Sequence, residues 1–387
     1  MLFARNHHMT VHASSTVGDR WRDFDLMMFL TVLVLTGFGI VAIWSAVGAP
    51  ALLSNNDGSK QALFSVIGVL LMLAAASLDY RYLKSAAWLL YAGGNLGLLA
   101  VLSPLGYAPP GTGAQNWINL GVTTIQPSEF TKITTIIALS AFISSHGEAM
   151  KDLGNFIIAG LIVALPTGLI LLGPDLGQTM IYLALWASVL LVTRTRKRYL
   201  IALAMALPAL ILFAWNFILQ DYQRQRILLS YNPGSAPQAG GYQIIQARIS
   251  IGAGGLLGSG LHGGTQSTMN LLGVRESDFI FAHASGMFGF IGMIALLTAL
   301  VIFLWRCIKV VEISHDSFGQ CLAMCIAGVL FFQSFLNIGM NVGIMPVAGT
   351  TLPFVSAGVS SLWTFMILTG ILQSVRMHHR RLTFGRR

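Results

Sequence analysis

The chain has 387 residues, of which 55% are hydrophobic and only 10% are charged, and its mean hydropathy is +0.71. Soluble domains carry roughly 25% charged residues, so this composition excludes a soluble globular domain and predicts an all-α integral membrane protein. The formal net charge of +9 is not gathered in a soluble basic domain. It therefore indicates contact with anionic lipid headgroups, and nucleic acid is excluded as a partner.

Ten apolar segments follow one another along the chain, and a helix needs roughly 20 residues to cross a bilayer. The second, third and fourth segments are shorter than this, and their ends are the least well defined. No cleavage site precedes the first segment, which is expected to be an uncleaved anchor. The predicted cores of the ten transmembrane helices are 26–47, 62–77, 86–101, 130–143, 156–172, 176–192, 199–218, 279–307, 321–345 and 354–372.

The basic residues predict the orientation, because cytoplasmic loops are enriched in Lys and Arg. An even number of spans places both termini on one side, and 17 of the 23 Lys and Arg residues lie on that side. We therefore expect a cytoplasmic tail over 1–25, a membrane domain over 26–375 and a cytoplasmic basic tail over 376–387. The connection 219–278, between the seventh and eighth spans, is then a long extracytoplasmic loop, and loops of that length are usually functional.

The long loop contains the stretch YQIIQARISIGAGGLLGSGL, which predicts an interfacial or re-entrant helix followed by a glycine-rich turn. The glycines of 252–260 superficially resemble a dinucleotide-binding loop, but no strand precedes them, so they are expected to allow close backbone approach. Four arginines in the loop oppose the positive-inside trend. Structural or headgroup pairing and recognition of a phosphate-bearing ligand explain them equally well, since guanidinium groups match phosphate oxygens. They are Arg224, Arg226, Arg248 and Arg275.

Charged residues also occur where the fourth span begins, in GAQNWINLGVTTIQPSEFTKITTII. Gln126 followed by Pro127 predicts a helix start, and Glu129 and Lys132, three residues apart, share one helix face. Ionisable groups within a span are costly and by default mark a functional cavity. The alternative is a self-neutralising pair that only holds helices together.

Three other features favour structural roles. Asp175 lies just before the sixth span and is predicted to cap that helix. Gly339 and Gly343 form a GxxxG pattern, which is typical of helix packing in membranes. The three cysteines have no metal-like spacing and are expected to be reduced packing residues.

Asp278 stands directly before the eighth span, where a carboxylate could either cap the helix or act in a site. Its surroundings belong to a series of segments that occur in one order along the chain: GAQNWINLG, QPSEFTK, GPDLGQT, GYQIIQARISIGAGGLLGSGL, GTQS, SDFIFA, GFIG and MPVAGTTLPFVSAGVSS. These segments resemble the SEDS family (shape, elongation, division and sporulation), the membrane proteins typified by RodA and FtsW. The sequence QRILLSYNP before GYQIIQ is more similar to the RodA branch.

The resemblance implies the SEDS fold and a peptidoglycan glycosyltransferase of the bacterial cytoplasmic membrane. Such an enzyme polymerises lipid II at the outer face, releases undecaprenyl pyrophosphate, and works with a class B penicillin-binding protein, a transpeptidase. The essential aspartate of the family falls on Asp278. A partly desolvated carboxylate near the bilayer surface can act as general base, because desolvation raises its pKa toward working pH.

The resemblance and the residue types together give a set of substrate-binding candidates. Arginine, lysine or a divalent cation such as Mg²⁺ or Mn²⁺ can offset the charge of the leaving pyrophosphate; no cofactor is firmly implied, and no protein metal ligands are assigned. The candidates are Glu129, Lys132, Arg226, Arg248, Arg275 and Gln246.

This chain also departs from the family pattern at three places, and the departures keep two alternatives open. One is a catalytically weakened scaffold for the transpeptidase; the other, suggested by the charged pair in a span, is a lipid flippase or transporter. Glu276 could compensate for one of the missing acidic residues. The departures are Gly273 and Val274, Gly286 and Met287, and Ala357 and Val359.

The orientation can be tested by labelling single cysteines in intact cells with a membrane-impermeant reagent. A cysteine placed at Ser235 in the long loop is expected to react, and one placed at Thr383 in the basic tail is expected to be protected until the membrane is opened. Labelling in the reverse pattern would overturn the topology.

Overall fold

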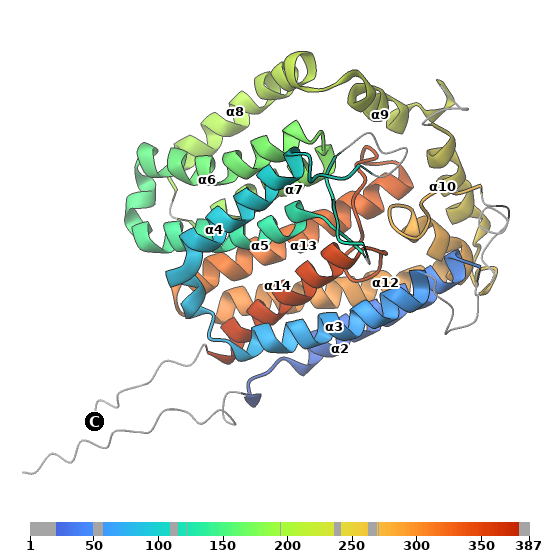
Figure 1. The fold of residues 1–387 in the computed structure, drawn as a ribbon, viewed down its shortest axis with the longest axis horizontal. Helices are drawn as coiled ribbons and strands as arrows, with labels where there is room; N and C mark the ends of the chain where they lie inside the picture. Colours follow the sequence, from blue (N-terminus) through green and yellow to red (C-terminus); the bar gives the residue numbers. More distant parts are fainter. Residues whose placement is uncertain are drawn as a thin grey trace, which may run out of the picture.

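The computed structural model describes residues 21–48, 57–108, 115–121, 123–193, 195–235, 241–261, 269 and 271–378. Over these ranges the chain is a bundle of helices with one two-stranded sheet (Figure 1). The first half contains α2 (Leu26–Ala46), α3 (Asp57–Ser77), α4 (Arg81–Leu102), β1 (Ile118–Asn119), β2 (Thr124–Ile125), α5 (Pro127–His146), α6 (Leu153–Leu172) and α7 (Leu176–Leu190). The second half contains α8 (Lys197–Phe213), α9 (Asp221–Tyr231), α10 (Gly241–Ala253), α12 (Ile280–Ile313), α13 (Ser317–Val342) and α14 (Val359–Met377).

Each predicted apolar segment overlaps a helix, so a mostly helical membrane architecture is confirmed. Within the described ranges, seven helices are long and apolar enough to cross a membrane: α2, α3, α4, α6, α8 with its continuation to Ile218, α12 and α13. The shorter α7 is apolar over its 15 residues. The other two of the ten predicted spans correspond to α5 and α14, which carry many of the polar residues of the site described below.

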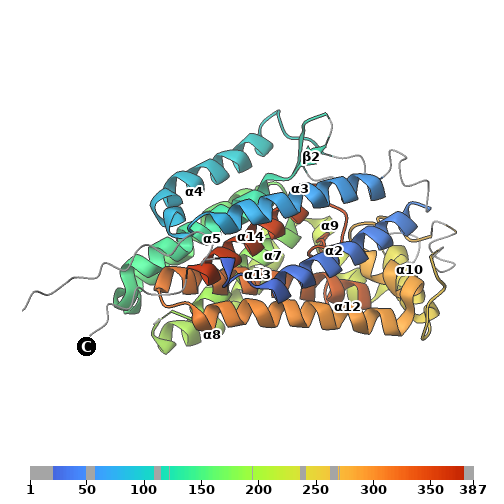
Figure 2. The same ribbon diagram turned by 90° about the horizontal axis from the view of Figure 1, so that it is seen from below.

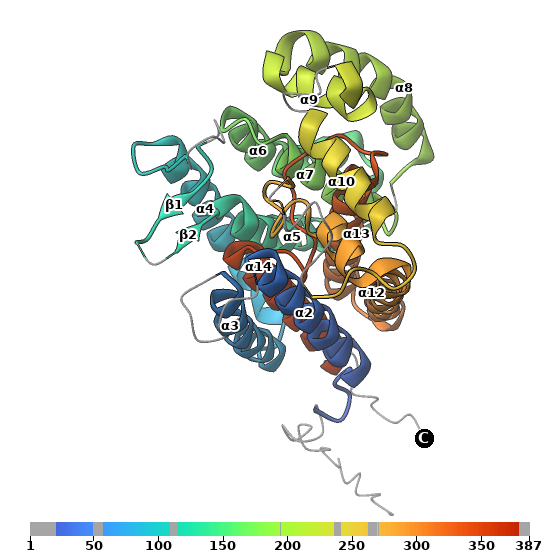
Figure 3. The ribbon, with the colours of Figure 1, turned by 90° about the vertical axis from the view of Figure 1, so that its right-hand side faces the viewer.

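Helix α13 forms the centre of the bundle and packs against α5, α7, α12 and α14. Around it, α3 packs on α14, α2 on α12, and α4 on α5 (Figures 2 and 3). Helix α8 lies along the edge of the bundle in Figure 1, and none of its residues is buried. Among the described helices, α5 and α14 bury the most polar side chains, with six each, and α13 buries four.

Buried charges join the beginning of α2 to the end of α14. Asp25 accepts a hydrogen bond from Met28 N and forms ion pairs with Arg306 and Arg376. Its backbone also exchanges two hydrogen bonds of 2.9 Å with the Gln373 carboxamide. Both ends of the described chain thus lie at the same end of the bundle, and Asp25, the last residue of the predicted tail, belongs to the packed domain.

The described parts of the long loop match the predicted helix and glycine turn. After α10, the chain passes so close to α12 that a Cβ atom on Gly258 would lie 2.2 Å from the Met287 carbonyl oxygen. Ser259 N donates to the Gly286 carbonyl (2.9 Å), and Phe290 N donates to the Gly255 carbonyl (2.9 Å). Helix α12 is interrupted at the same place, at Gly289 with φ 63° and ψ −167°. Residues 236–240, 262–268 and 270 of the loop lie outside the described ranges.

Two predicted span cores extend three or more residues beyond the observed helices. Helix α13 ends at Val342 rather than Met345, because Gly343 takes a left-handed conformation (φ 84°) and caps it; Gly343 therefore ends a helix, a role that the GxxxG interpretation missed. Helix α14 begins at Val359 rather than Phe354, because the preceding residues form a loop that contacts the Asp278 segment.

Candidate functional site

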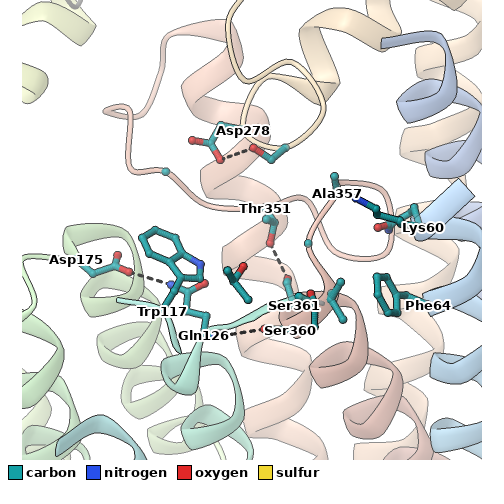
Figure 4. Close-up of a pocket in the computed structure, with 17 residues that line it drawn as sticks. Lys60, Phe64, Trp117, Gln126, Asp175, Asp278, Thr351, Ala357, Ser360 and Ser361 are labelled. Carbon is teal, nitrogen blue, oxygen red and sulfur yellow. Dashed lines mark hydrogen bonds between the residues drawn. The ribbon is translucent and has the colours of Figure 1, made fainter. Parts of the chain in front are cut away.

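A pocket of about 450 Å³ opens where α3, α5, α7 and α14 begin, beside the segment that leads into α12. Asp175 and Asp278 line it from two sides, and Lys60 lines it from α3 (Figure 4). The β1–β2 hairpin contributes Trp117 and Thr124, with Ile118 paired to Ile125 at its base. The pocket thus brings together two carboxylates, a cation and an aromatic ring from distant parts of the chain.

The segment before α12 is held through its backbone. Ala357 N donates to the Glu276 carbonyl (2.8 Å), and Ser356 Oγ donates to the Ser277 carbonyl (2.7 Å). The Asp278 carboxylate itself receives one side-chain hydrogen bond within the described chain, from Ser277 Oγ at 3.3 Å. Because the loop is fixed by its peptide groups, the carboxylate remains available to a ligand in the pocket.

The same segment contains a strained residue. Val274 has φ 50°, a left-handed conformation that is a genuine outlier for a β-branched side chain. Its carbonyl accepts from both Ser277 N and Phe279 N at 3.3 Å, so the chain turns sharply just before Asp278. Backbone strain of this kind is concentrated at functional sites.

Asp175 is the N-cap of α7, as predicted, and it is also a pocket residue, which the sequence analysis missed. Its Oδ1 accepts from Gln178 N (3.0 Å), while its Oδ2 accepts from Asn116 Nδ2 and Gln126 Nε2, both at 3.2 Å. Three donors therefore fix this carboxylate, in contrast to the single donor on Asp278.

Both pocket carboxylates titrate closer to neutrality than an ordinary aspartate. Burial raises the pKa of Asp278 to about 6, against the opposing effects of the Ser277 hydrogen bond and the positive charge of Arg226. Burial likewise raises the pKa of Asp175 to about 6, against the hydrogen bond from Gln178 N. A group with such a pKa can accept a proton and still be largely ionised at neutral pH.

The predicted Glu129–Lys132 pair exists and lies buried beneath the pocket. Lys132 Nζ is 3.0 Å from Glu129 Oε2 and donates to Gln333 Oε1 at 2.9 Å. Glu129 Oε1 accepts from Gln178 Nε2 at 2.6 Å. Neither charged group lines the pocket, so the pair can reach a ligand only through its neighbours.

From those neighbours, two branches of hydrogen bonds extend to the residues that line the pocket. On one side, Gln333 Nε2 donates to the Thr351 hydroxyl (3.2 Å), which bonds Ser361 Oγ (2.6 Å). On the other side, Gln178 is linked to Asp175 and through it to Gln126, whose backbone N donates to Ser360 Oγ (2.9 Å). The two branches meet at the beginning of α14 (Figure 4).

The other predicted binding residues lie outside the pocket lining. Arg275 Nε donates to the Ala46 carbonyl at the end of α2 (2.7 Å). Arg248 Nη2 donates to the Ser230 carbonyl (3.1 Å). Arg226 is exposed on α9, and its charge acts on both Asp175 and Asp278. Gln246 lies on α10.

A divalent cation would find few protein ligands in this pocket. The described residues contain no group of three or more His, Cys, Asp or Glu side chains that could hold a metal ion. Hard cations prefer six or more oxygen ligands, and Asp175 already accepts three hydrogen bonds. The described residues therefore form no metal site from protein ligands alone, whereas Mg²⁺ is usually held by one or two carboxylates together with waters and substrate phosphates.

Comparison with known proteins identifies the lineage. The family model described as "Cell cycle protein", which groups FtsW, RodA and SpoVE, matches residues 25–381. The chain belongs to this family. It is 32% identical to peptidoglycan glycosyltransferase MrdB of Escherichia coli K12, over 93% of this chain and 95% of that protein. It is 30% identical to peptidoglycan glycosyltransferase RodA of Treponema pallidum, over 91% and 97% of the two chains.

Solved structures agree with this assignment. A chain of a peptidoglycan synthase complex, described as coordinating polymerization and crosslinking, superposes with a TM-score of 0.78 at 27% identity, covering 92% of this chain and 98% of that one. The rod shape determining protein RodA of Thermus thermophilus gives a TM-score of 0.66 at 25% identity, with 92% and 97% covered. The predicted family membership is confirmed.

The burial of Asp278 predicts a pH-dependent stability. Its folded pKa of about 6 lies above the ordinary value of about 3.9, so protonation of this carboxyl favours the folded state. This stabilisation is complete below about pH 4 and is lost as the pH rises to about 6. Asp278→Asn cannot ionise. Its melting temperature is therefore expected to rise relative to wild type between about pH 4 and pH 6.

Thermal unfolding in detergent over pH 4–8 measures this difference. Asp221→Asn is the control, because the Asp221 side chain is 90% exposed. A difference between Asp278→Asn and wild type that stays constant with pH would contradict the assignment.

Proposed function

We propose that the chain is a peptidoglycan glycosyltransferase that polymerises lipid II in this pocket, with Asp278 as the general base. The observation that carries the proposal is the Asp278 carboxylate, which has one side-chain donor among the described residues and lines a pocket of about 450 Å³. The activity is that of the relatives, which are named peptidoglycan glycosyltransferases.

In the proposed reaction, the 4-hydroxyl oxygen of one sugar attacks the anomeric carbon of another. A new C–O bond forms, the bond from the anomeric carbon to the pyrophosphate oxygen breaks with inversion, and undecaprenyl pyrophosphate leaves. Asp278 takes the hydroxyl proton, for which the raised pKa suits it. Asp175, fixed by three donors, keeps its position and orients the hydroxyl groups of the sugar.

The leaving pyrophosphate needs positive charge, and a preorganised cation supplies it without reorganisation during the reaction. Lys60 lines the pocket. Arg226 carries an exposed guanidinium group whose field reaches both carboxylates. Arg248 and Arg275 bond backbone carbonyls elsewhere, so Arg226 is the best supported of the predicted arginines.

The pocket is proposed to face outward from the bacterial cytoplasmic membrane, in a ten-span topology with cytoplasmic termini. Asp25 and Gln373 bring the start of α2 and the end of α14 together, while the pocket lies at the start of α14. Basic residues flank the end that carries the termini, and the positive-inside rule makes that end cytoplasmic.

A class B penicillin-binding protein is the proposed partner. One similar structure comes from a complex that coordinates polymerization and crosslinking, and this supports a transpeptidase as partner.

Polymerisation of lipid II by the purified chain distinguishes an enzyme from a flippase, because a flippase would move lipid II across the membrane without joining it.

The general-base assignment predicts the behaviour of Asp278→Asn. The variant keeps the size of the side chain but cannot accept the hydroxyl proton, so glycan formation from lipid II is expected to fall by about 10² to 10⁴. Gel analysis of the glycan chains made by purified protein measures the loss, with melting temperature as the folding control. A folded variant that polymerises at a near wild-type rate removes Asp278 from the mechanism, and an inactive wild type favours the scaffold.

Arg226 and Arg248, two of the four loop arginines, give a matched comparison. Arg226→Ala is expected to raise the KM for lipid II by roughly tenfold, since hydrogen bonds to charged groups contribute about 1.5–3 kcal/mol. Arg248→Ala, which loses a bond to the Ser230 carbonyl, is expected to lower thermal stability and leave the KM of the folded protein near wild type. Unchanged kinetics in both variants would assign the arginines to headgroup or structural contacts.

A further inference from the structure

Helix α13 carries three carboxamide side chains in one row. Gln333, Asn337 and Asn341 are spaced four residues apart, so they share one face of the helix, and all three are fully buried. They contact the two segments that form the pocket wall, the one before α12 and the one before α14. Helix packing through GxxxG explains none of these contacts.

Asn341 caps the first turn of α12 from the neighbouring helix. Helix α12 begins at Ile280, so Ala282 N is one of the first-turn donors that have no partner within the helix. Here Ala282 N donates to Asn341 Oδ1 (3.1 Å), and Asn341 Nδ2 donates to the Asp278 carbonyl (3.0 Å). The regular backbone pattern begins one residue later, where His283 N donates to the carbonyl of the N-cap residue Phe279 (3.0 Å). A side chain of α13 therefore caps α12 and ties its first turn to the Asp278 carbonyl.

Asn337 joins that turn to the opposite wall of the pocket. Its Nδ2 donates to the Asp278 carbonyl (3.1 Å) and to the Thr350 carbonyl (2.6 Å). The next residue, Thr351, lines the pocket and is bonded by Gln333, which also accepts from Lys132. One row of carboxamides thus fixes the distance between the Asp278 backbone and the Thr351 wall.

We infer that Asn337 and Asn341 are positioning residues for Asp278. A carboxamide can donate and accept at once, and a buried carbonyl must be paired; these two side chains satisfy the Asp278 carbonyl without using its carboxylate. They hold the backbone in a place set by α13, and the carboxylate stays open to substrate. The inference rests on the proposed role of Asp278 as general base.

The test replaces each asparagine with an apolar side chain of similar size. Asn341→Leu and Asn337→Leu remove the donors to the Asp278 carbonyl, and kcat for lipid II polymerisation is expected to fall by about 10²-fold, as it does when a reacting group is misplaced by about 1 Å. KM is expected to stay within about threefold, because the pocket residues that would bind substrate are unchanged.

Asn95→Leu is the matched control. Asn95 is also buried, but among the described residues its carboxamide bonds Tyr91 of its own helix, α4. This variant is expected to retain wild-type kcat and KM after any loss of stability has been measured. If Asn341→Leu does not fold, Asn341→Asp decides the matter, since it keeps the shape and the acceptor for Ala282 N and removes the amide donor to Asp278. A reduced kcat with unchanged KM is expected for it too.

Two results would overturn the inference. One is a wild-type kcat in folded variants of Asn337 and Asn341. The other is an equal loss of kcat in the variants of Asn337, Asn341 and Asn95, which would indicate general destabilisation. Asp278→Asn is measured in the same series. If Asp278→Asn is active, the proposed general base is wrong; if it is inactive while the asparagine variants are active, only the positioning role is wrong.

Discussion

The buried ion pair between Glu129 and Lys132 is the interaction on which the site depends. Removing two charges from water costs on the order of several kcal/mol per ion, and their attraction offsets this cost only when further hydrogen bonds satisfy both groups. The partners come from two other helices, Gln178 on α7 and Gln333 on α13. The pair therefore fixes three helices relative to one another, and the same two glutamines pass that constraint to the pocket wall at Asp175 and Thr351.

Different support gives the two pocket carboxylates different properties. Asp175 is held by three donors to its oxygens, whereas Asp278 is held by its peptide groups and keeps its oxygens nearly free. Burial raises the pKa of both carboxyl groups to about 6, so the difference between them lies in how many donors hold their oxygens. This difference follows from where the hydrogen bonds fall, on a side chain in one case and on the backbone in the other.

Local patterns predicted much of this architecture. The apolar segments, the helix start at Gln126, the Asp175 cap and the Glu129–Lys132 pair all depend on neighbours in sequence, and the motifs led to the family and to Asp278. The contacts between distant segments could not be predicted: Gln333 meets Lys132 from 201 residues away, and Asn341 meets Asp278 from 63. Charge alone likewise made the loop arginines equivalent, because no sequence pattern marks the backbone carbonyls that Arg248 and Arg275 bond.

Most of the residues that depart from the family pattern contact their neighbours through backbone groups. Gly286 and Met287 serve the glycine turn through their carbonyls, and Ala357 serves the Glu276 carbonyl through its N–H. Any residue other than proline offers that N–H, and every residue offers a carbonyl. The substitutions therefore leave the frame around Asp278 intact, and the open carboxylate at its centre favours an enzyme over a scaffold. Val274 differs, because its side chain must tolerate a left-handed backbone, and the strain lies four residues before the aspartate that the frame positions.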